Sequence, residues 1–204
     1  LISSAVIAID RNNDTKAAKE YIDEAETVIN SKSLTEVREK DLAKFYFYKG
    51  LINYRVHQSE DPAIKGLDAE ALDKALSGFT SLLEFEKKIG KERYTDEAVA
   101  QITSLANAIA GRGIEASGSG DTESAYEDFL QTYNLKRDIL GNTDTSMYYN
   151  AAIMAQQMKA YDKALDIYKD LLKLDYHGTR FRAIKAESGD TVEFLSPKQM
   201  EIAV

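Results

Sequence analysis

The sequence predicts an all-α chain of about four antiparallel helix pairs stacked into a superhelix, followed by a β-hairpin. Three observations support this prediction. Alanine, leucine, glutamate and lysine dominate between the two prolines, Pro62 and Pro197, and these residue types favour helices. Both prolines lie at breaks in the helical pattern. A fixed spacing of small and bulky residues also recurs along the chain, which is typical of stacked helical repeats.

The clearest unit extends from Tyr148 to Tyr176 and contains two short amphipathic patterns separated by a break at Lys159-Ala160. Small residues, Ala152 and Ala164, stand where the two helices would touch. Two helices approach closely where a small side chain removes bulk from the contact. One such pair leaves an apolar flank uncovered, so we expect it to stack on similar pairs.

The same register recurs in two further units and, with an insertion, in a third. A residue of the first helix is followed, 12 positions later, by a small residue of the second helix. A further residue follows 4 positions after that one, and the last residue of the set follows 3 positions later again. The sets are Ala152, Ala164, Tyr168 and Leu171; Gly113, Ala125, Phe129 and Thr132; and Val6, Ala18, Ile22 and Ala25. The remaining unit keeps Gly50, Ala75, Phe79 and Leu82, with about 13 residues inserted after the glycine.

Polar and glycine-containing breaks divide the chain into expected helices. They span residues 2–11, 15–31, 35–58, 68–89, 95–116, 121–139, 145–158 and 161–175. The first is expected to end at the turn Arg11-Asn12-Asn13-Asp14, the fourth at Gly90 and the fifth at Ser117-Gly118-Ser119-Gly120. A loop that contains Pro62 is expected from residue 59 to residue 66.

The period changes after the last helix. Residues 181–186 and 191–195 flank Glu187-Ser188-Gly189-Asp190, which predicts a β-hairpin. Ser196-Pro197 has the pattern of an N-cap and a first helical residue. The chain is therefore divided into a helical repeat domain, 1–178, and a segment, 179–204, with the hairpin and the start of a further helix. Because it begins at leucine and ends inside a helical pattern, we interpret the chain as part of a longer protein.

Composition argues against several classes of partner and site. The formal net charge is −8, which disfavours nucleic acid or an anionic membrane as the main partner. There is no cysteine, which excludes disulfides, thiolate metal sites and a cysteine nucleophile within the chain. No apolar run approaches the roughly 18 residues of a transmembrane helix, so no membrane insertion is expected.

The unit from Tyr148 to Tyr176 resembles the tetratricopeptide repeat (TPR), and similar spacing covers most of residues 1–178. The resemblance implies a right-handed superhelix and a non-catalytic scaffold that binds a protein or peptide, with no cofactor. The usual closing proline is replaced by Tyr176, and units are longer than the family's about 34 residues. A hairpin after the array also resembles TPR proteins of the bacterial cell envelope, which implies a periplasmic or envelope location; a cytoplasmic location is the alternative.

In the TPR family, ligands lie in a concave groove formed by the first helix of each pair. On matching positions, the resemblance implies a peptide-binding groove made of Lys44, Phe47, Leu51, Tyr54, Arg55, Asn107, Tyr149, Asn150, Ile153 and Gln156. Rings supply contact area and amides hydrogen-bond a peptide backbone. The alternative is that these aromatic residues only pack between neighbouring helices.

Other motifs are interpreted as structural. Asp10 to Asp14 is a helix–helix turn, because a calcium loop would need glycine and glutamate where Thr15 and Tyr21 stand. His57 and His177 have no metal-ligand partner in sequence, and each suits a helix end. The glycines of Gly111-Arg112-Gly113 are interpreted as helix-contact positions. No catalytic triad or acid–base pair is supported.

Two other functions stay open at this point. The array is also compatible with a regulatory or substrate-presenting arm of an enzyme whose catalytic domain lies beyond Val204. A binder of small apolar ligands or carbohydrates, using the aromatic run Phe45-Tyr46-Phe47-Tyr48, is the other alternative.

Overall fold

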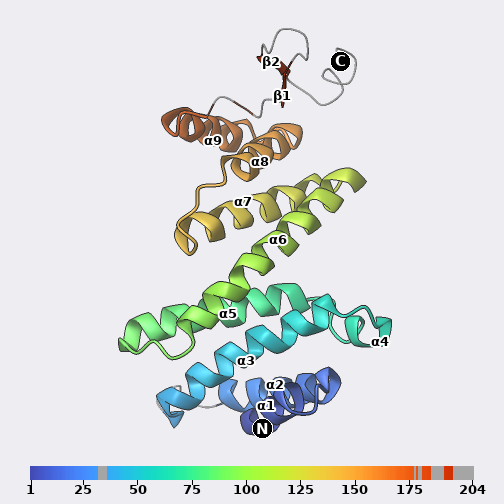
Figure 1. Cartoon of the computed structure of the whole chain (residues 1–204), viewed down its shortest axis with the longest axis vertical. Coiled ribbons are helices and arrows are strands. Elements are labelled where there is room, and N and C mark those ends of the chain that lie inside the picture. Colours follow the sequence, from blue (N-terminus) through green and yellow to red (C-terminus); the bar gives the residue numbers. More distant parts are fainter. Residues whose placement is uncertain (32–35, 177, 179–180, 185–190, 195–204) are drawn as a thin grey trace.

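The computed structural model describes residues 1–31, 36–176, 178, 181–184 and 191–194. In this part of the chain, nine helices follow one another and pack sequentially in antiparallel pairs (Figure 1). The helices are α1 (Ile2–Asp10), α2 (Thr15–Asn30), α3 (Glu39–Gln58), α4 (Pro62–Lys65), α5 (Ala71–Ile89), α6 (Thr95–Ser119), α7 (Thr122–Asp138), α8 (Thr145–Gln157) and α9 (Tyr161–Lys173). None of these helices is both long and apolar enough to cross a membrane.

The pairs α1/α2, α3/α5, α6/α7 and α8/α9 are the four expected units, and they follow one another along the long axis of the molecule (Figure 1). Several boundaries differ from the prediction: α3 begins at Glu39 and not at residue 35, and α5 begins at Ala71 and not at residue 68. The expected loop around Pro62 contains the short helix α4, which begins at that proline and is capped by Asp61. Helix α6 continues through Gly118 and ends only at Gly120, whose positive φ of 86° provides the left-handed cap.

Strands β1 (Phe181–Ile184) and β2 (Thr191–Phe194) pair antiparallel, with Phe181 opposite Phe194. The predicted turn at residues 187–190 and the helix start at Ser196-Pro197 lie outside the described residues.

Helices α3 and α5 approach each other closely through two glycines. A Cβ atom on Gly78 would lie 2.4 Å from the backbone nitrogen of Gly50, and one on Gly50 would lie 2.6 Å from the ring of Phe79. Neither contact leaves room for a side chain. The prediction that Gly50 is a helix-contact position is confirmed. The small residue that faces it on α5 is Gly78, which is not part of the recurring register.

In the other units, the two helices also meet at small residues, but less closely. A Cβ atom on Gly113 would lie 3.0 Å from the Cβ of Asp128 on α7. Ala152 and Ala164 of the last pair are 0% and 4% exposed, as the register predicts. In the first pair, Val6 is only half-buried, whereas its neighbour Ala5 is fully buried. The contact position in α1 is therefore Ala5, one residue before the position that the register predicts.

The core is a row of three apolar clusters, each of which joins neighbouring helix pairs. The first contains residues of α1, α2 and α3, the second residues of α3, α5, α6 and α7, and the third residues of α7, α8 and α9. Because each cluster takes side chains from consecutive pairs, no pair buries its apolar face alone. This arrangement confirms the expected sequential stacking.

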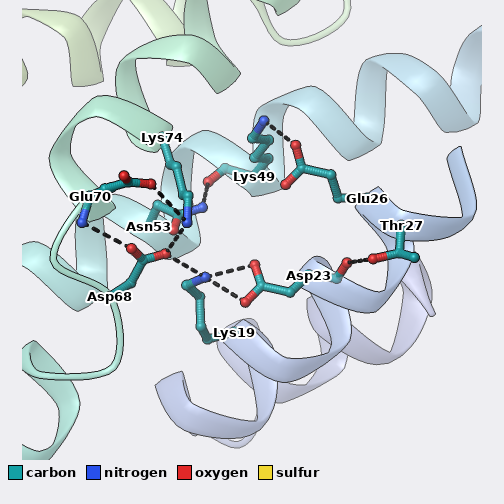
Figure 2. A network of polar contacts seen from close by, with 9 residues as sticks. All are labelled: Lys19, Asp23, Glu26, Thr27, Lys49, Asn53, Asp68, Glu70 and Lys74. Carbon is teal, nitrogen blue, oxygen red and sulfur yellow. Dashed lines mark hydrogen bonds and ion pairs between the residues drawn. The ribbon is translucent and has the colours of Figure 1, made fainter. Parts of the chain in front are cut away.

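A buried polar network also joins the first pair to the second (Figure 2). The Lys19 side chain of α2 is 6% exposed, and its Nζ lies 2.8 Å from a carboxylate oxygen of Asp68, which precedes α5. The same oxygen lies 2.7 Å from Nζ of Lys74, and Lys19 also contacts Asp23. Beside this cluster, Lys49 of α3 pairs with Glu26 of α2 at 2.6 Å. Lys19 and Asp68 are the buried members of this network, and buried charges are tolerated when they have such partners.

The start of α6 is capped by a carboxylate of α5. Glu86 is 0% exposed and accepts hydrogen bonds from the backbone N–H groups of Arg93 and Tyr94, at 2.9 and 3.2 Å, and from the hydroxyl of Thr95, at 2.8 Å. Tyr94 is the N-cap residue of α6 and makes no capping bond with its own side chain. Glu86 therefore supplies the acceptor and the negative charge that a helix N-terminus favours.

Replacing this carboxylate by its amide, Glu86→Gln, should lower the free energy of unfolding by about 2 kcal/mol, because charge-assisted hydrogen bonds are lost and an NH₂ group faces buried donors. Urea unfolding followed by circular dichroism measures the change. The control is Glu84→Gln, at an exposed residue of the same helix, for which we expect a change below about 0.5 kcal/mol. Equal midpoints for the two variants would contradict the capping role.

Candidate functional site

The sequence-predicted groove residues of α3 do not lie together on an open surface. Phe47 is 9% exposed and its ring stacks on Tyr94 with 4.9 Å between centroids. Tyr54 is 4% exposed and stacks on His57. Both therefore belong to the core between α3, α5 and α6. Their placement corresponds to the packing alternative and not to a ligand-contacting role.

The other predicted groove residues of α3 and α6 lie in different environments. Leu51 is half-buried against the same core, and Lys44 lines a small hollow near the start of α3. Arg55 and Asn107 are exposed. In the described part of the chain, none of these side chains forms a hydrogen bond or ion pair with another predicted groove residue. The structure thus places them without joining them into a site.

The predicted residues of α8 do lie on one helix face. Tyr149, Ile153 and Gln156 are spaced at intervals of 4 and 3, so their side chains follow one another along that face. Tyr149 is 37% exposed, Gln156 is exposed, and Ile153 and Asn150 are half-buried. We call Tyr149, Asn150, Ile153 and Gln156 the α8 face.

Two tyrosines of the following segment border the α8 face. The Tyr149 ring centroid lies 5.5 Å from that of Tyr176 and 6.2 Å from that of Tyr168. The Tyr168 hydroxyl donates a hydrogen bond to Oε1 of Gln156 at 3.3 Å. Burial raises the pKa of Tyr168, so its phenol is neutral near pH 7. The result is an uncharged surface of rings and amides, which offers apolar contact area and hydrogen-bonding groups but no nucleophile.

Arg112 has a structural role at the centre of the molecule. Its guanidinium donates hydrogen bonds to Asp128 of α7 at 2.7 and 2.9 Å and to Asp73 of α5 at 2.9 Å. It therefore ties α5, α6 and α7 together with bidentate pairs. The interpretation of the adjacent glycines as contact positions is confirmed for Gly113 but wrong for Gly111, which has no heavy atom within 4 Å of an added Cβ.

The other motifs interpreted as structural have structural roles where they lie within the described residues. The turn after α1 contains Asn13 at a positive φ of 52°, and Asp14 caps α2 by accepting from Ala17 N–H. His57 does lie in the last turn of α3, as expected. Burial lowers its pKa, with Lys65 and Arg112 adding to the effect, so its ring is neutral near pH 7. His177 lies outside the described residues. No cluster of metal-binding side chains occurs in the described part of the chain.

A hollow surface also lies between α5 and α7, where sequence reasoning predicted nothing. Three adjoining hollows share lining residues, among them Asp73 and Glu127 at one junction and Glu84 and Ile139 at the other. They therefore form one continuous surface, which we call the α5–α7 groove. It depends on how α5, α6 and α7 pack against one another, which no local sequence pattern encodes.

No family model matches the chain, and neither a curated protein nor a solved structure shows significant similarity to it. The α8 face and the α5–α7 groove are therefore assessed on their own geometry and chemistry.

Proposed function

We propose that the chain is a non-catalytic scaffold of the TPR type, a right-handed superhelix that binds a peptide or protein segment on the α8 face. One observation carries this proposal. Tyr149, Ile153 and Gln156 follow one another on an accessible face of the last helix pair, next to the ring of Tyr168. A mixture of rings and amides without charge is the composition that suits an uncharged peptide segment.

The proposal is narrower than the groove implied by the resemblance. Phe47 and Tyr54 are buried, so we assign the binding to the α8 face and leave α3 out of it. The same burial weakens the small-ligand alternative, because Phe45 and Phe47 of the aromatic run are 2% and 9% exposed. A location in the cell envelope, and an enzyme domain beyond Val204, stay predictions from sequence.

A random-peptide library displayed on phage and selected against the full chain tests this proposal. We expect enriched peptides whose affinity falls about tenfold or more in Tyr149→Ala, because a central ring often carries most of a small interface's energy. Fluorescence anisotropy with labelled synthetic peptides gives the dissociation constants. Circular dichroism verifies that each variant keeps its helical content.

Tyr21→Ala is a matched control, since Tyr21 is 38% exposed, against 37% for Tyr149, but lies on α2 at the other end of the stack. The control should bind the selected peptides with unchanged affinity. If the two variants lose affinity equally, or if no peptide is enriched, the assignment to the α8 face is wrong.

A further inference from the structure

The α5–α7 groove has a length and a lining that define a ligand class. Helix α6 is 25 residues long and packs on both α5 and α7, and Figure 1 shows it running from the level of one to the level of the other. Along α5 the groove extends from Asp73 to Gly90. At 1.5 Å per helical residue, this corresponds to about 25 Å, or roughly five helical turns.

The middle of the groove is lined by apolar side chains from both helices. Leu83 of α5 and Leu130 of α7 are half-buried, as is Ile139 just after α7. Leu76 and Leu135 are 8% and 6% exposed and lie beneath them. An apolar strip of this kind gains free energy when an apolar partner removes it from water.

The charged residues that line the groove are predominantly acidic. Nine carboxylates stand against three cations, and these cations are Lys87, Arg112 and Lys163. Arg112 is already held by Asp73 and Asp128, and Lys163 lies over the ring of Tyr126 at 5.2 Å. Asp73 and Asp128 are thus paired with Arg112, whereas the other carboxylates have no ion-pair partner among the cations that line the groove.

Four of these carboxylates have no ion-pair or hydrogen-bond partner among the described residues. They are exposed and come from successive elements around the groove: Glu84 from α5, Glu92 from the α5–α6 loop, Glu115 from α6 and Glu127 from α7. Glu84, Glu92 and Glu127 line the same hollows as the apolar strip, and Glu115 lines the adjoining hollow, so unpaired negative charge borders the strip. A partner with cationic side chains flanking an apolar stripe complements both features.

We propose that the α5–α7 groove binds a basic amphipathic α-helix of a partner protein. A helix satisfies its own backbone hydrogen bonds, so it needs from the groove only an apolar strip and charge at the rim. Apolar residues at a spacing of 3 and 4 would lie on the leucines, and lysine or arginine on either side would pair with the four carboxylates. This surface is separate from the α8 face, so the two proposals fail independently.

Binding is tested with a synthetic peptide of leucine and lysine, about 18 residues long and with leucine at helical period. We expect saturable one-to-one binding by isothermal titration calorimetry and an increase in peptide helicity. Reversing two rim charges, Glu84→Lys with Glu127→Lys, should weaken the affinity about tenfold or more. Higher salt should also weaken it, because the rim charges are exposed.

Two controls separate recognition from general charge attraction. Glu20→Lys with Glu24→Lys changes the net charge equally at exposed, unpaired residues of α2, and it should leave the affinity nearly unchanged. A peptide of the same composition in scrambled order has no apolar face and should bind weakly. The proposal is overturned if both double variants lose affinity equally, if the scrambled or a glutamate-containing peptide binds as well, or if no peptide binds. A dimer of the chain in sedimentation that the groove variant abolishes would identify a second copy as the occupant instead.

Discussion

Replacing Gly78 by alanine should lower the free energy of unfolding by about 3 kcal/mol. The added methyl group would lie 2.4 Å from the nitrogen and 2.8 Å from the Cα atom of Gly50, and 3.0 Å from the carbonyl oxygen of Tyr46. All three atoms are backbone, so no rotamer change relieves the overlap. The helices α3 and α5 must separate, which loosens the core on both sides of the contact. Urea unfolding measured by circular dichroism gives the change in free energy.

Gly111→Ala is the matched control, because this glycine also lies inside a long helix but has no neighbour within 4 Å of an added Cβ. There the substitution should raise the free energy of unfolding by up to about 1 kcal/mol, since alanine is the better helix former. The two substitutions are therefore expected to have opposite signs. A stabilising effect at both positions would contradict the close approach of α3 and α5.

The second large effect is expected at the buried ion network of Figure 2. Asp68→Asn should lower the free energy of unfolding by about 3 kcal/mol, because Lys19 and Lys74 lose the carboxylate that they share. The control is Asp41→Asn in the exposed pair of Asp41 and Arg38, where we expect less than about 0.5 kcal/mol. Equal losses at the two sites would mean that burial does not strengthen the network.

The same carboxylate makes stability depend on acid pH. Burial by itself would raise the pKa of Asp68, but hydrogen bonds from Lys19 and Lys74 outweigh burial and lower the pKa to about 2, from an ordinary 3.8. A pKa lowered by folding means that the unfolded chain binds the proton more readily. The contribution is therefore complete above about pH 4 and is lost as the pH falls towards 2, with about 2 kcal/mol at stake. Unfolding curves of wild type and Asp68→Asn should converge by that amount over this interval; a constant difference would contradict it.

The helix pairs are predictable from sequence because their signals are local. Turn residues such as the polar run before Asp14 and the glycines at 90 and 120 mark helix ends directly. The recurring register identifies Gly113, Ala152 and Ala164 because each contact repeats at a fixed separation along the chain. These features depend on residues that are close together in the sequence, so a local sequence pattern is enough to predict them.

The contacts that sequence reasoning missed depend on how distant segments meet. In the sequence, Gly78 is only a residue with a low helix propensity. Its contact with α3 becomes visible only in the structure. The groove assignment of Phe47 did not take into account that the loop before α6 brings Tyr94 over its ring. Glu86 similarly caps a helix that begins several residues later. Tertiary placement decides each of these cases.

The central claim, that the α8 face holds a peptide, is tested most directly by methyl NMR of the full chain with labelled isoleucines. Ile153 reports on the α8 face and Ile139 on the α5–α7 groove. Addition of a library-selected peptide should shift the Ile153 methyl signal and leave Ile139 in place, whereas the basic amphipathic peptide should do the reverse. A selected peptide that leaves Ile153 unchanged, or that shifts only signals elsewhere, would contradict the assignment.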